Sequence, residues 1–284
     1  MDGWALAVDI GETSVAAAVS EQGRTAVVAF PDSPTMSPAV FCPPGQAPIA
    51  GPLAAPQLAA APERAVLAPK RALARGDTVT VAGEAVALAE VYAALLSAVT
   101  AQAARDRVPA VPPRLVLTFP AAPGSRELDV LLAAARSAGL PAPDLVPELV
   151  AAAWCLAADS APGQLVAVLD TGGSRIDTAV LRRTADGFKF ASQPGTLARP
   201  ADDPEEIVRR GADELLATTA RAGLAPDQLA AVCVTGQASR IANAAVLITQ
   251  TLGIFPRMAP DPRTAVALGA LTGVLGPAAR ARGA

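Results

Sequence analysis

Two acidic residues flank a glycine-rich turn in the run Asp170-Thr171-Gly172-Gly173-Ser174-Arg175-Ile176-Asp177. Apolar stretches lie on both sides, at 165–169 and 178–181, so the run predicts a β-hairpin with a carboxylate at each end. Glycines let the backbone approach an anion and direct its N–H groups at phosphate oxygens, while carboxylates suit a metal, its waters or an attacking water. The alternative is an ordinary hairpin with solvated ends.

A second copy of this pattern lies near the start of the chain. The apolar stretch 6–8 leads into Asp9-Ile10-Gly11-Glu12-Thr13, and another apolar stretch follows at 15–19. Two such hairpins, one in each half of the chain, predict two related lobes that close on a ligand from both sides.

Composition narrows the chemistry that is available. Lys and Arg total 23 against 26 Asp and Glu, giving a net charge of −3 without long blocks of one sign, which favours neither nucleic acid nor an anionic membrane as a partner. The chain has no histidine, which excludes histidine-based triads and histidine-ligated metals and directs any catalysis to carboxylates and lysine. Cys42, Cys155 and Cys233 lack metal or redox spacing and are expected to be reduced apolar fillers.

The sequence predicts a cytoplasmic protein without membrane insertion. The first residues enter a predicted strand directly, which leaves no room for a signal peptide. An apolar run of about 18 residues, the length needed to span a bilayer, does not occur.

In the first half of the chain, strands are expected within 4–30, and the proline-rich segment 31–69 cannot be mostly helix. A short strand at 78–81 and a long alanine-rich helix over 83–107 follow. Further elements are predicted at 114–119 (strand), 125–138 (helix ended by Gly139) and 148–158 (helix).

The second half repeats this plan more briefly. Hairpins are expected over 165–190, followed by a loop to residue 204, a helix over 205–222, a strand over 230–234, and helices over 238–252 and 264–275. The repetition predicts an α/β fold of two lobes, 1–163 with a proline-rich insert at about 31–113, and 164–284.

The order of motifs resembles the nucleotide-binding domain of the heat-shock protein 70 chaperones, within the actin-like ATPase superfamily. The resemblance covers nearly the whole chain. It implies duplicated actin-like, ribonuclease H-like lobes with a cleft between them, the second lobe lacking its outer subdomain. The matching segments are 9–13 and 170–177 for the two phosphate motifs, Lys70-Arg71, 115–121, 136–140 with 148–153, 235–241 for the adenosine motif, and 261–270.

The resemblance implies that ATP and Mg²⁺ are the ligands and assigns roles residue by residue. Asp9 and Asp170 would face the metal and its waters. Lys70, Glu148 and Asp177 would neutralise the transferred phosphoryl group, hold the metal's waters or orient the nucleophile. The nucleotide would be bound by Gly11, Thr13, Gly172, Gly173, Gly236 and Arg240, the last stacking on adenine.

Three of these residues have simpler explanations. Lys70, beside Arg71, can be a solvated cation, and Arg240 can be an ordinary surface residue of its helix. Glu148 lies near a predicted helix start, where a carboxylate stabilises the helix dipole regardless of catalysis.

The sequence also departs from the family pattern. Glu12 stands beside the phosphates and would repel them if it points inward. Ser174 and Arg175 replace Gly and Thr, and Gln237 replaces the second Gly of the adenosine motif. Only residues 178–235 separate the two motifs of the second lobe, where the family inserts a subdomain that covers adenine. The motif Glu206-Ile-Val-Arg209-Arg210 only faintly resembles its adenine contact.

Two functions are therefore compared. The first is an ATP-binding protein with weak or slow Mg²⁺-dependent hydrolysis that acts as a nucleotide-dependent switch. The second is a pseudo-ATPase scaffold of the same fold that binds an unknown protein partner, such as a secretion or envelope complex, without turnover. A sugar or acetate kinase of the same superfamily is a third, weaker interpretation, because no substrate-binding insert is recognisable.

Overall fold

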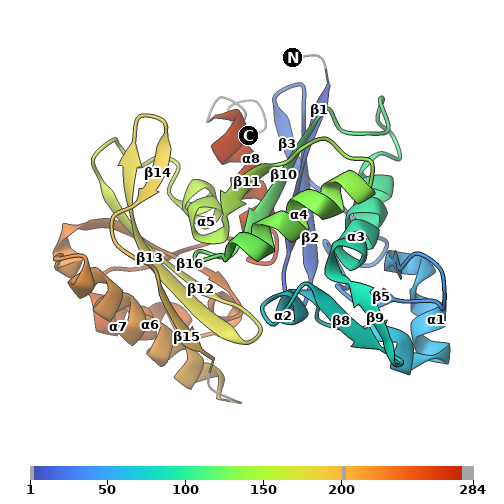
Figure 1. The fold of residues 1–284 in the computed structure, drawn as a ribbon. Coiled ribbons are helices and arrows are strands. Elements are labelled where there is room, and N and C mark those ends of the chain that lie inside the picture. The colour runs from blue at the N-terminus through green and yellow to red at the C-terminus, as the bar shows by residue number, and fades with distance from the viewer. Residues whose placement is uncertain (1–2, 200–202, 277–284) are drawn as a thin grey trace. The chain divides into compact units, whose positions relative to one another are not determined.

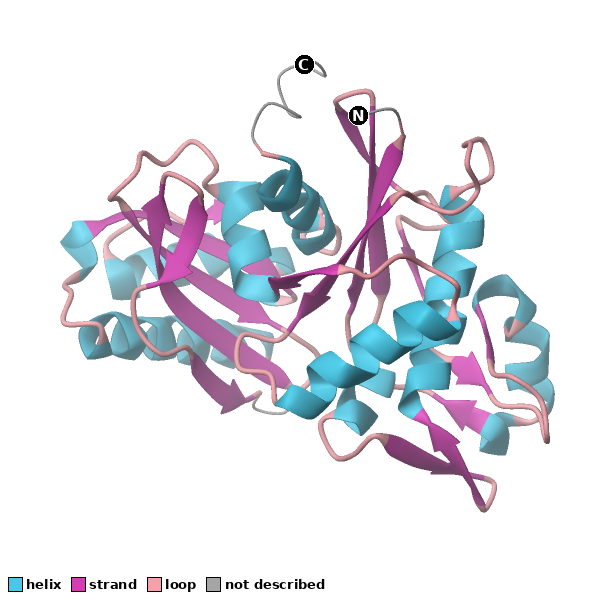
Figure 2. Ribbon diagram, turned by 45° about the horizontal axis from the view of Figure 1, so that its top comes forward, coloured by secondary structure: helices cyan, strands magenta, loops and turns pink. Residues whose placement is uncertain are grey.

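The computed structural model describes residues 3–199 and 203–276, which contacts divide into two compact units. The first unit contains residues 3–119 and 123–145, and the second contains 120–122 with the described residues from 146 onward. Helices and β-sheet occur in both units (Figures 1 and 2). The predicted α/β class is therefore confirmed.

The first unit is built on a sheet in which strands follow the order β10-β1-β2-β3. β1 (Trp4–Ile10) pairs antiparallel with β2 (Val15–Glu21) and parallel with β10 (Arg114–Phe119). β1 is almost entirely buried, as expected for a central strand covered on both faces. β3 (Arg24–Val27) and β4 (Thr35–Met36) both pair with β2, and β11 (Asp144–Pro147) follows β10 in the strand order. The helices of this unit beyond the proline-rich segment are α3 (Leu88–Ala103) and α4 (Ser125–Ser137).

Short elements make up the proline-rich segment, as its composition predicts, because proline cannot continue a helix or a ladder. A small sheet joins β5 to β6 and β7, and a separate hairpin joins β8 to β9. The elements are β5 (Val40–Phe41), β6 (Ile49–Ala50), η1 (Gly51–Leu53), α1 (Ala55–Ala60), η2 (Pro62–Arg64), β7 (Ala65–Val66), α2 (Pro69–Leu73), β8 (Thr78–Val81) and β9 (Glu84–Ala87).

The helix expected over 83–107 is shorter than predicted. Ala82 and Gly83 adopt φ of 48° and 85° and form a tight turn that directs residues 84–87 back along β8 as β9. Left-handed φ at both central residues is what a two-residue hairpin requires. Helix α3 consequently begins at Leu88.

In the second unit, the strands of the sheet follow the order β14-β13-β12-β16-β17, with β15 paired to β13. Alternate residues of β12 (Leu165–Thr171) enter two different cores: Leu165, Ala167 and Leu169 one, Val166 and Val168 the other. Helices α6 and α7 pack against the first of these faces and α5 against the second. The other elements are α5 (Glu148–Leu156), β13 (Arg175–Thr184), β14 (Gly187–Phe190), β15 (Gly195–Ala198), α6 (Pro204–Arg221), η3 (Pro226–Gln228), β16 (Leu229–Gly236), η4 (Ala238–Arg240), α7 (Ala244–Leu252), β17 (Arg257–Met258) and α8 (Ala265–Leu275).

Two predictions for this unit need correction. The loop expected before residue 204 contains the strand β15, which pairs with β13 from Arg175 to Thr178. The single helix expected over 238–252 is divided, because Ile241 is extended and Asn243 is non-helical, so that the 3₁₀ turn η4 and the helix α7 are separate.

Helix α5 belongs to the second unit, although the sequence places a boundary later, at residue 163. Its Leu149, Ala153 and Trp154 are buried in the core formed with β12 and β13. It also packs closely on α8, where glycines take the contact positions. A Cβ at Gly269 would collide with the carbonyl oxygen of Ala151. The absence of a side chain there permits the two backbones to approach.

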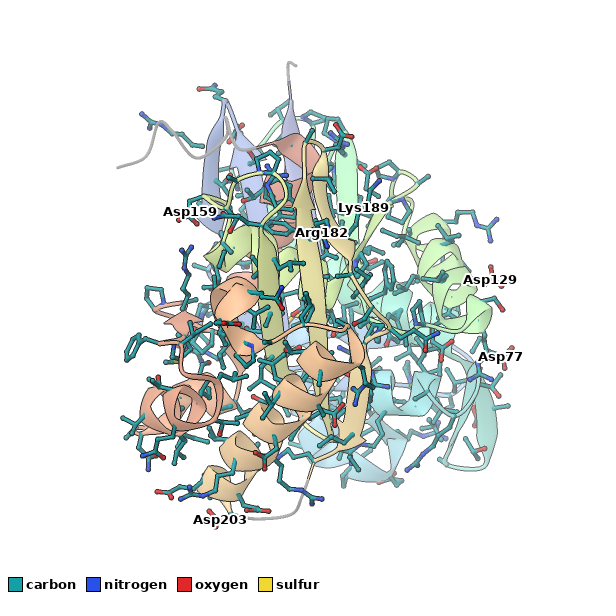
Figure 3. All side chains as sticks on the ribbon, turned by 90° about the vertical axis from the view of Figure 1, so that its left-hand side faces the viewer. Asp77, Asp129, Asp159, Arg182, Lys189 and Asp203 are labelled. Carbon is teal, nitrogen blue, oxygen red and sulfur yellow. The ribbon has the colours of Figure 1, made fainter. Side chains whose placement is uncertain are left out.

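Neighbouring arginines of β13 point to opposite faces. Arg182 is exposed, as Figure 3 shows together with Lys189 of β14. Arg183 is only 8 % exposed, and its guanidinium lies 4.6 Å from the ring centroid of Trp154 and 5.4 Å from that of Phe188. Cation–π contact of this kind, removed from water, contributes on the order of 2 kcal/mol.

The three cysteines are free thiols, and Cys42 and Cys233 are buried. Burial raises the pKa of the Cys233 thiol to about 12, so it stays protonated at neutral pH and behaves as an apolar side chain. Among the helices of the described residues, none combines the length and apolar character needed to cross a bilayer.

We expect Gly269→Ala to destabilise the protein by about 2 kcal/mol or more, because the new methyl group must push α8 away from α5. Urea unfolding followed by circular dichroism measures this loss. Gly76→Ala is the matched control, since its Cβ would meet nothing closer than 3.7 Å. Equal stability of the two variants would contradict the proposed close contact.

Candidate functional site

The first acidic turn, residues 9–14, lies at the end of β1. The Gly11 N–H donates to the Ser14 carbonyl at 2.9 Å, and a Cβ on Gly11 would come within 2.8 Å of that same oxygen. Glycine is therefore required for the turn. Because β10 runs parallel to β1, Thr118 lies beside Asp9 and its hydroxyl donates to Asp9 Oδ1 at 2.7 Å. Thr13 is exposed within the turn.

Helix α2 is attached to this turn by an ion pair. The Arg71 guanidinium lies 3.2 Å from the carboxylate of Glu12, whose side chain is only 11 % exposed. The negative charge of Glu12 is thus paired with a cation. Lys70, half-buried, precedes Arg71 on the same short helix. The predicted lysine and the first acidic turn therefore belong to one corner of the first unit.

The second acidic turn joins β12 to β13. Asp170 and Asp177 are direct cross-strand partners, and the Gly172 N–H donates to the Arg175 carbonyl at 2.9 Å. Asp177 is only 8 % exposed and accepts a hydrogen bond of 2.6 Å from the Thr196 hydroxyl of β15. The Arg175 guanidinium lies 3.7 Å from Asp177, so its charge is directed at that carboxylate.

Gly236 ends β16 directly beside this turn. Its φ is +76°, and a Cβ there would collide with the Thr171 carbonyl and lie 2.6 Å from Asp170 Oδ1. The backbone N–H groups of Gln237 and Ala238 donate to the carbonyl and hydroxyl oxygens of Thr171, at 2.9 and 2.6 Å. The structure therefore brings Asp170, Gly172, Gly173, Asp177 and Gly236 together at one edge of the second sheet.

Arg199 is a residue of this edge that sequence reasoning missed. Its Nη1 donates to the Gly173 carbonyl at 3.2 Å, lies 3.5 Å from the Gly172 carbonyl, and also donates to Gln237 Oε1. A single guanidinium thus bridges the glycine turn and the turn after β16. Arg199 follows β15, and because that strand was not predicted, no sequence signal placed it here.

Glu148 and Arg240 are the remaining predicted site residues of the second unit. Glu148 is the first residue of α5 and is 6 % exposed. Arg240 ends the 3₁₀ turn η4 and is exposed. It lies near Asp261, whose pKa is held below its usual value mainly by the hydrogen-bonded Arg263 guanidinium and further by Arg240.

No group of three or more His, Cys, Asp or Glu side chains in the described residues could hold a metal. Mg²⁺ usually retains several waters and takes only one or two carboxylates besides substrate phosphates. Asp9 in the first unit and Asp170 in the second each supply one half-buried carboxylate at a strand end.

Comparison with known proteins yields no matching family model and no matching curated protein.

We expect Gly236→Ala to cost about 3 kcal/mol of unfolding free energy, because it combines left-handed strain with a collision against β12. Gly253→Ala is the matched control: its φ is +71°, but a Cβ there meets nothing within 4 Å. The control should lose only about 1 kcal/mol. Equal losses in urea unfolding would show that Gly236 makes no close contact with Asp170 and Thr171.

Proposed function

We propose that this chain is a heat-shock-protein-70-related, actin-like protein that binds ATP with Mg²⁺ weakly, hydrolyses it slowly and acts as a nucleotide-dependent switch. The observation that carries the proposal is the repeated arrangement of an acid and a glycine turn. In each unit an antiparallel hairpin ends in an aspartate and a tight glycine turn, and a parallel strand lies beside it. This repetition also supports duplicated actin-like lobes.

The proposed chemistry rests on positioning and charge. Bound Mg²⁺ would neutralise phosphate charge, and Asp9 and Asp170 would hold it through its waters. Asp177, fixed by Thr196, would orient the attacking water. Lys70 would stabilise charge on the transferred phosphoryl group, and Glu148 would position a water.

Phosphate and nucleoside would be held by the glycine turns. The N–H groups of Gly11 and Gly172 close their own turns, so phosphate oxygens would be bound by the other backbone N–H groups of these turns. Gly236 would let the chain pass close to the sugar, and Arg240 would stack on adenine. Because the second unit lacks the family's outer subdomain, we propose that affinity for nucleotide is low.

We expect calorimetric titration with Mg·ATP to give a Kd on the order of 100 μM. Asp170→Ala should abolish turnover, since it removes a metal-facing carboxylate, whereas Glu148→Ala should only slow it. Asp186→Ala, an exposed aspartate of the same unit, is the control and should leave both unchanged. Undetectable binding at millimolar nucleotide would reject the switch.

The second candidate is a pseudo-ATPase scaffold that binds a partner protein without turnover. The bridge from Arg199 to Gln237 favours it, because these two side chains span the two turns between which a nucleotide's phosphate and sugar would lie. Under this hypothesis, Arg199 and Gln237 permanently close the space between the two turns, and Arg199 does not bind phosphate.

The two candidates give opposite results for Arg199→Ala. Under the switch hypothesis, Arg199 turns to the phosphates, and its removal weakens Mg·ATP binding about tenfold, as expected for one charge-assisted hydrogen bond. We expect this loss. Arg210→Ala, an exposed arginine of α6, should have no effect. Tighter binding by Arg199→Ala would instead support the closed scaffold.

A further inference from the structure

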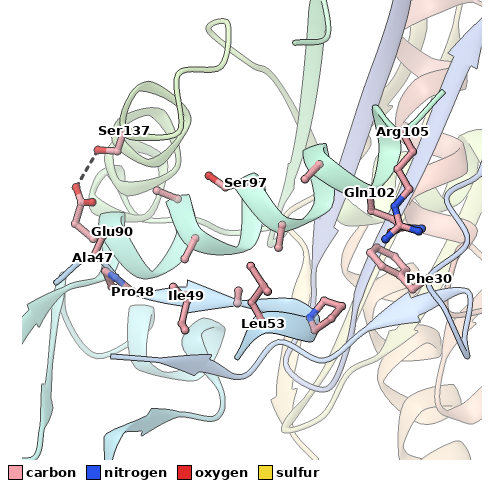
Figure 4. A pocket seen from close by; sticks show the side chains of 16 residues that line it. Phe30, Ala47, Pro48, Ile49, Leu53, Glu90, Ser97, Gln102, Arg105 and Ser137 are labelled. Atoms are coloured by element: carbon pink, nitrogen blue, oxygen red, sulfur yellow. Dashed lines mark hydrogen bonds between the residues drawn. The ribbon is translucent and has the colours of Figure 1, made fainter. Parts of the chain in front are cut away.

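A cavity in the first unit is lined by none of the residues of the candidate functional site. It has a volume of about 570 Å³ and is bounded by α3 and by the chain from Ala47 to Leu53, as Figure 4 shows. Ligand pockets typically measure about 300–1,000 Å³ and are mostly apolar with a few polar groups. This cavity meets both criteria.

The cavity exists because α3 carries small side chains on the face that lines it. Ala94, Ala98 and Ala101 lie there, whereas Leu95 and Val99 are fully buried in the core of the unit. The opposite wall includes Leu53, which is 74 % exposed and projects towards α3. An apolar occupant would remove Leu53 and the alanine surface from water, which favours binding.

An acidic side chain lies at one end of the cavity and a basic side chain lies at the other. At one end the carboxylate of Glu90 accepts a hydrogen bond of 2.9 Å from the Ser137 hydroxyl. At the other end lies Arg105, for which no hydrogen bond or ion pair occurs among residues 3–199 and 203–276. Fifteen positions of mostly helical chain place these ends roughly 22 Å apart.

We propose that this cavity binds a single-chain amphiphile with an anionic head, such as a free long-chain carboxylate. The head would pair with the Arg105 guanidinium, a donor that forms bidentate bonds with carboxylates. The chain would lie along Ala101, Ala98 and Ala94, opposite Leu53 and Ile49. None of these residues has a role in the proposed nucleotide chemistry, so the two proposals are independent.

Calorimetric titration with sodium dodecanoate, kept below its micelle concentration, tests this proposal on the full chain. We expect a Kd on the order of 10 μM. Arg105→Glu should weaken binding more than tenfold by reversing the charge at the head position. Ala101→Phe should do the same by filling the space for the chain. Arg75→Glu, an exposed arginine outside the cavity, is the matched charge control and should bind like the unmodified protein.

A second probe keeps the test decisive if one variant folds poorly. Dodecyltrimethylammonium has an apolar chain of the same length and a cationic head. The unmodified protein should prefer dodecanoate, and Arg105→Glu should reverse that preference. Equal affinity of all variants for dodecanoate would indicate non-specific adsorption and overturn the proposal. Failure to bind dodecanoate would also overturn the proposal. This holds even if the protein sediments with anionic phospholipid vesicles or binds an amphipathic helical peptide.

Discussion

The pairing of β12 with β13 on one side and β16 on the other fixes the candidate site of the second unit. In this register Asp170 lies opposite Asp177 and beside Thr235, and Thr171 lies beside Gly236. A slip of one residue would exchange the two faces of β12. Leu165, Ala167 and Leu169 would then face the core that Val166 and Val168 enter. The register that buries the sheet is therefore the same register that gathers the acids and glycines.

Covering the sheet on both faces requires segments that are far apart in the sequence. One face is completed by α5, which precedes β12 in the chain, and α8, the last helix of the described residues, packs on α5. Their contact depends on the missing Cβ of Gly269 and on Gly273, where a Cβ would lie 2.6 Å from Trp154. Helix packing alone thus explains Gly269 and Gly273 in α8, without any bound ligand.

The sequence predicts well the parts of the molecule that depend on local pattern. Alternating and continuous apolar runs identify β1, β10, β12 and β16, and Gly139 correctly ends a helix, with φ of +68°. Prediction fails where pairing partners decide the structure. Residues 84–87 are alanine-rich and helix-like in type, yet the turn at Ala82-Gly83 pairs them with β8. Likewise β15 is recognisable only through its partner β13. Arg199 and the Glu12–Arg71 pair depend on the same tertiary information.

The charge state of the bridge at Arg199 bears on the choice between switch and scaffold. Its hydrogen-bond partners among the described residues, two glycine carbonyls and the amide of Gln237, are all neutral. A guanidinium bound to neutral acceptors gains less than one bound to a phosphate, whose charge-assisted bonds are roughly twice as strong. An arriving phosphate could therefore displace Gln237 at little cost. By contrast, Glu12 already has its cation in Arg71. The neutral partners of Arg199 thus favour ligand binding at the second turn over a permanently closed scaffold.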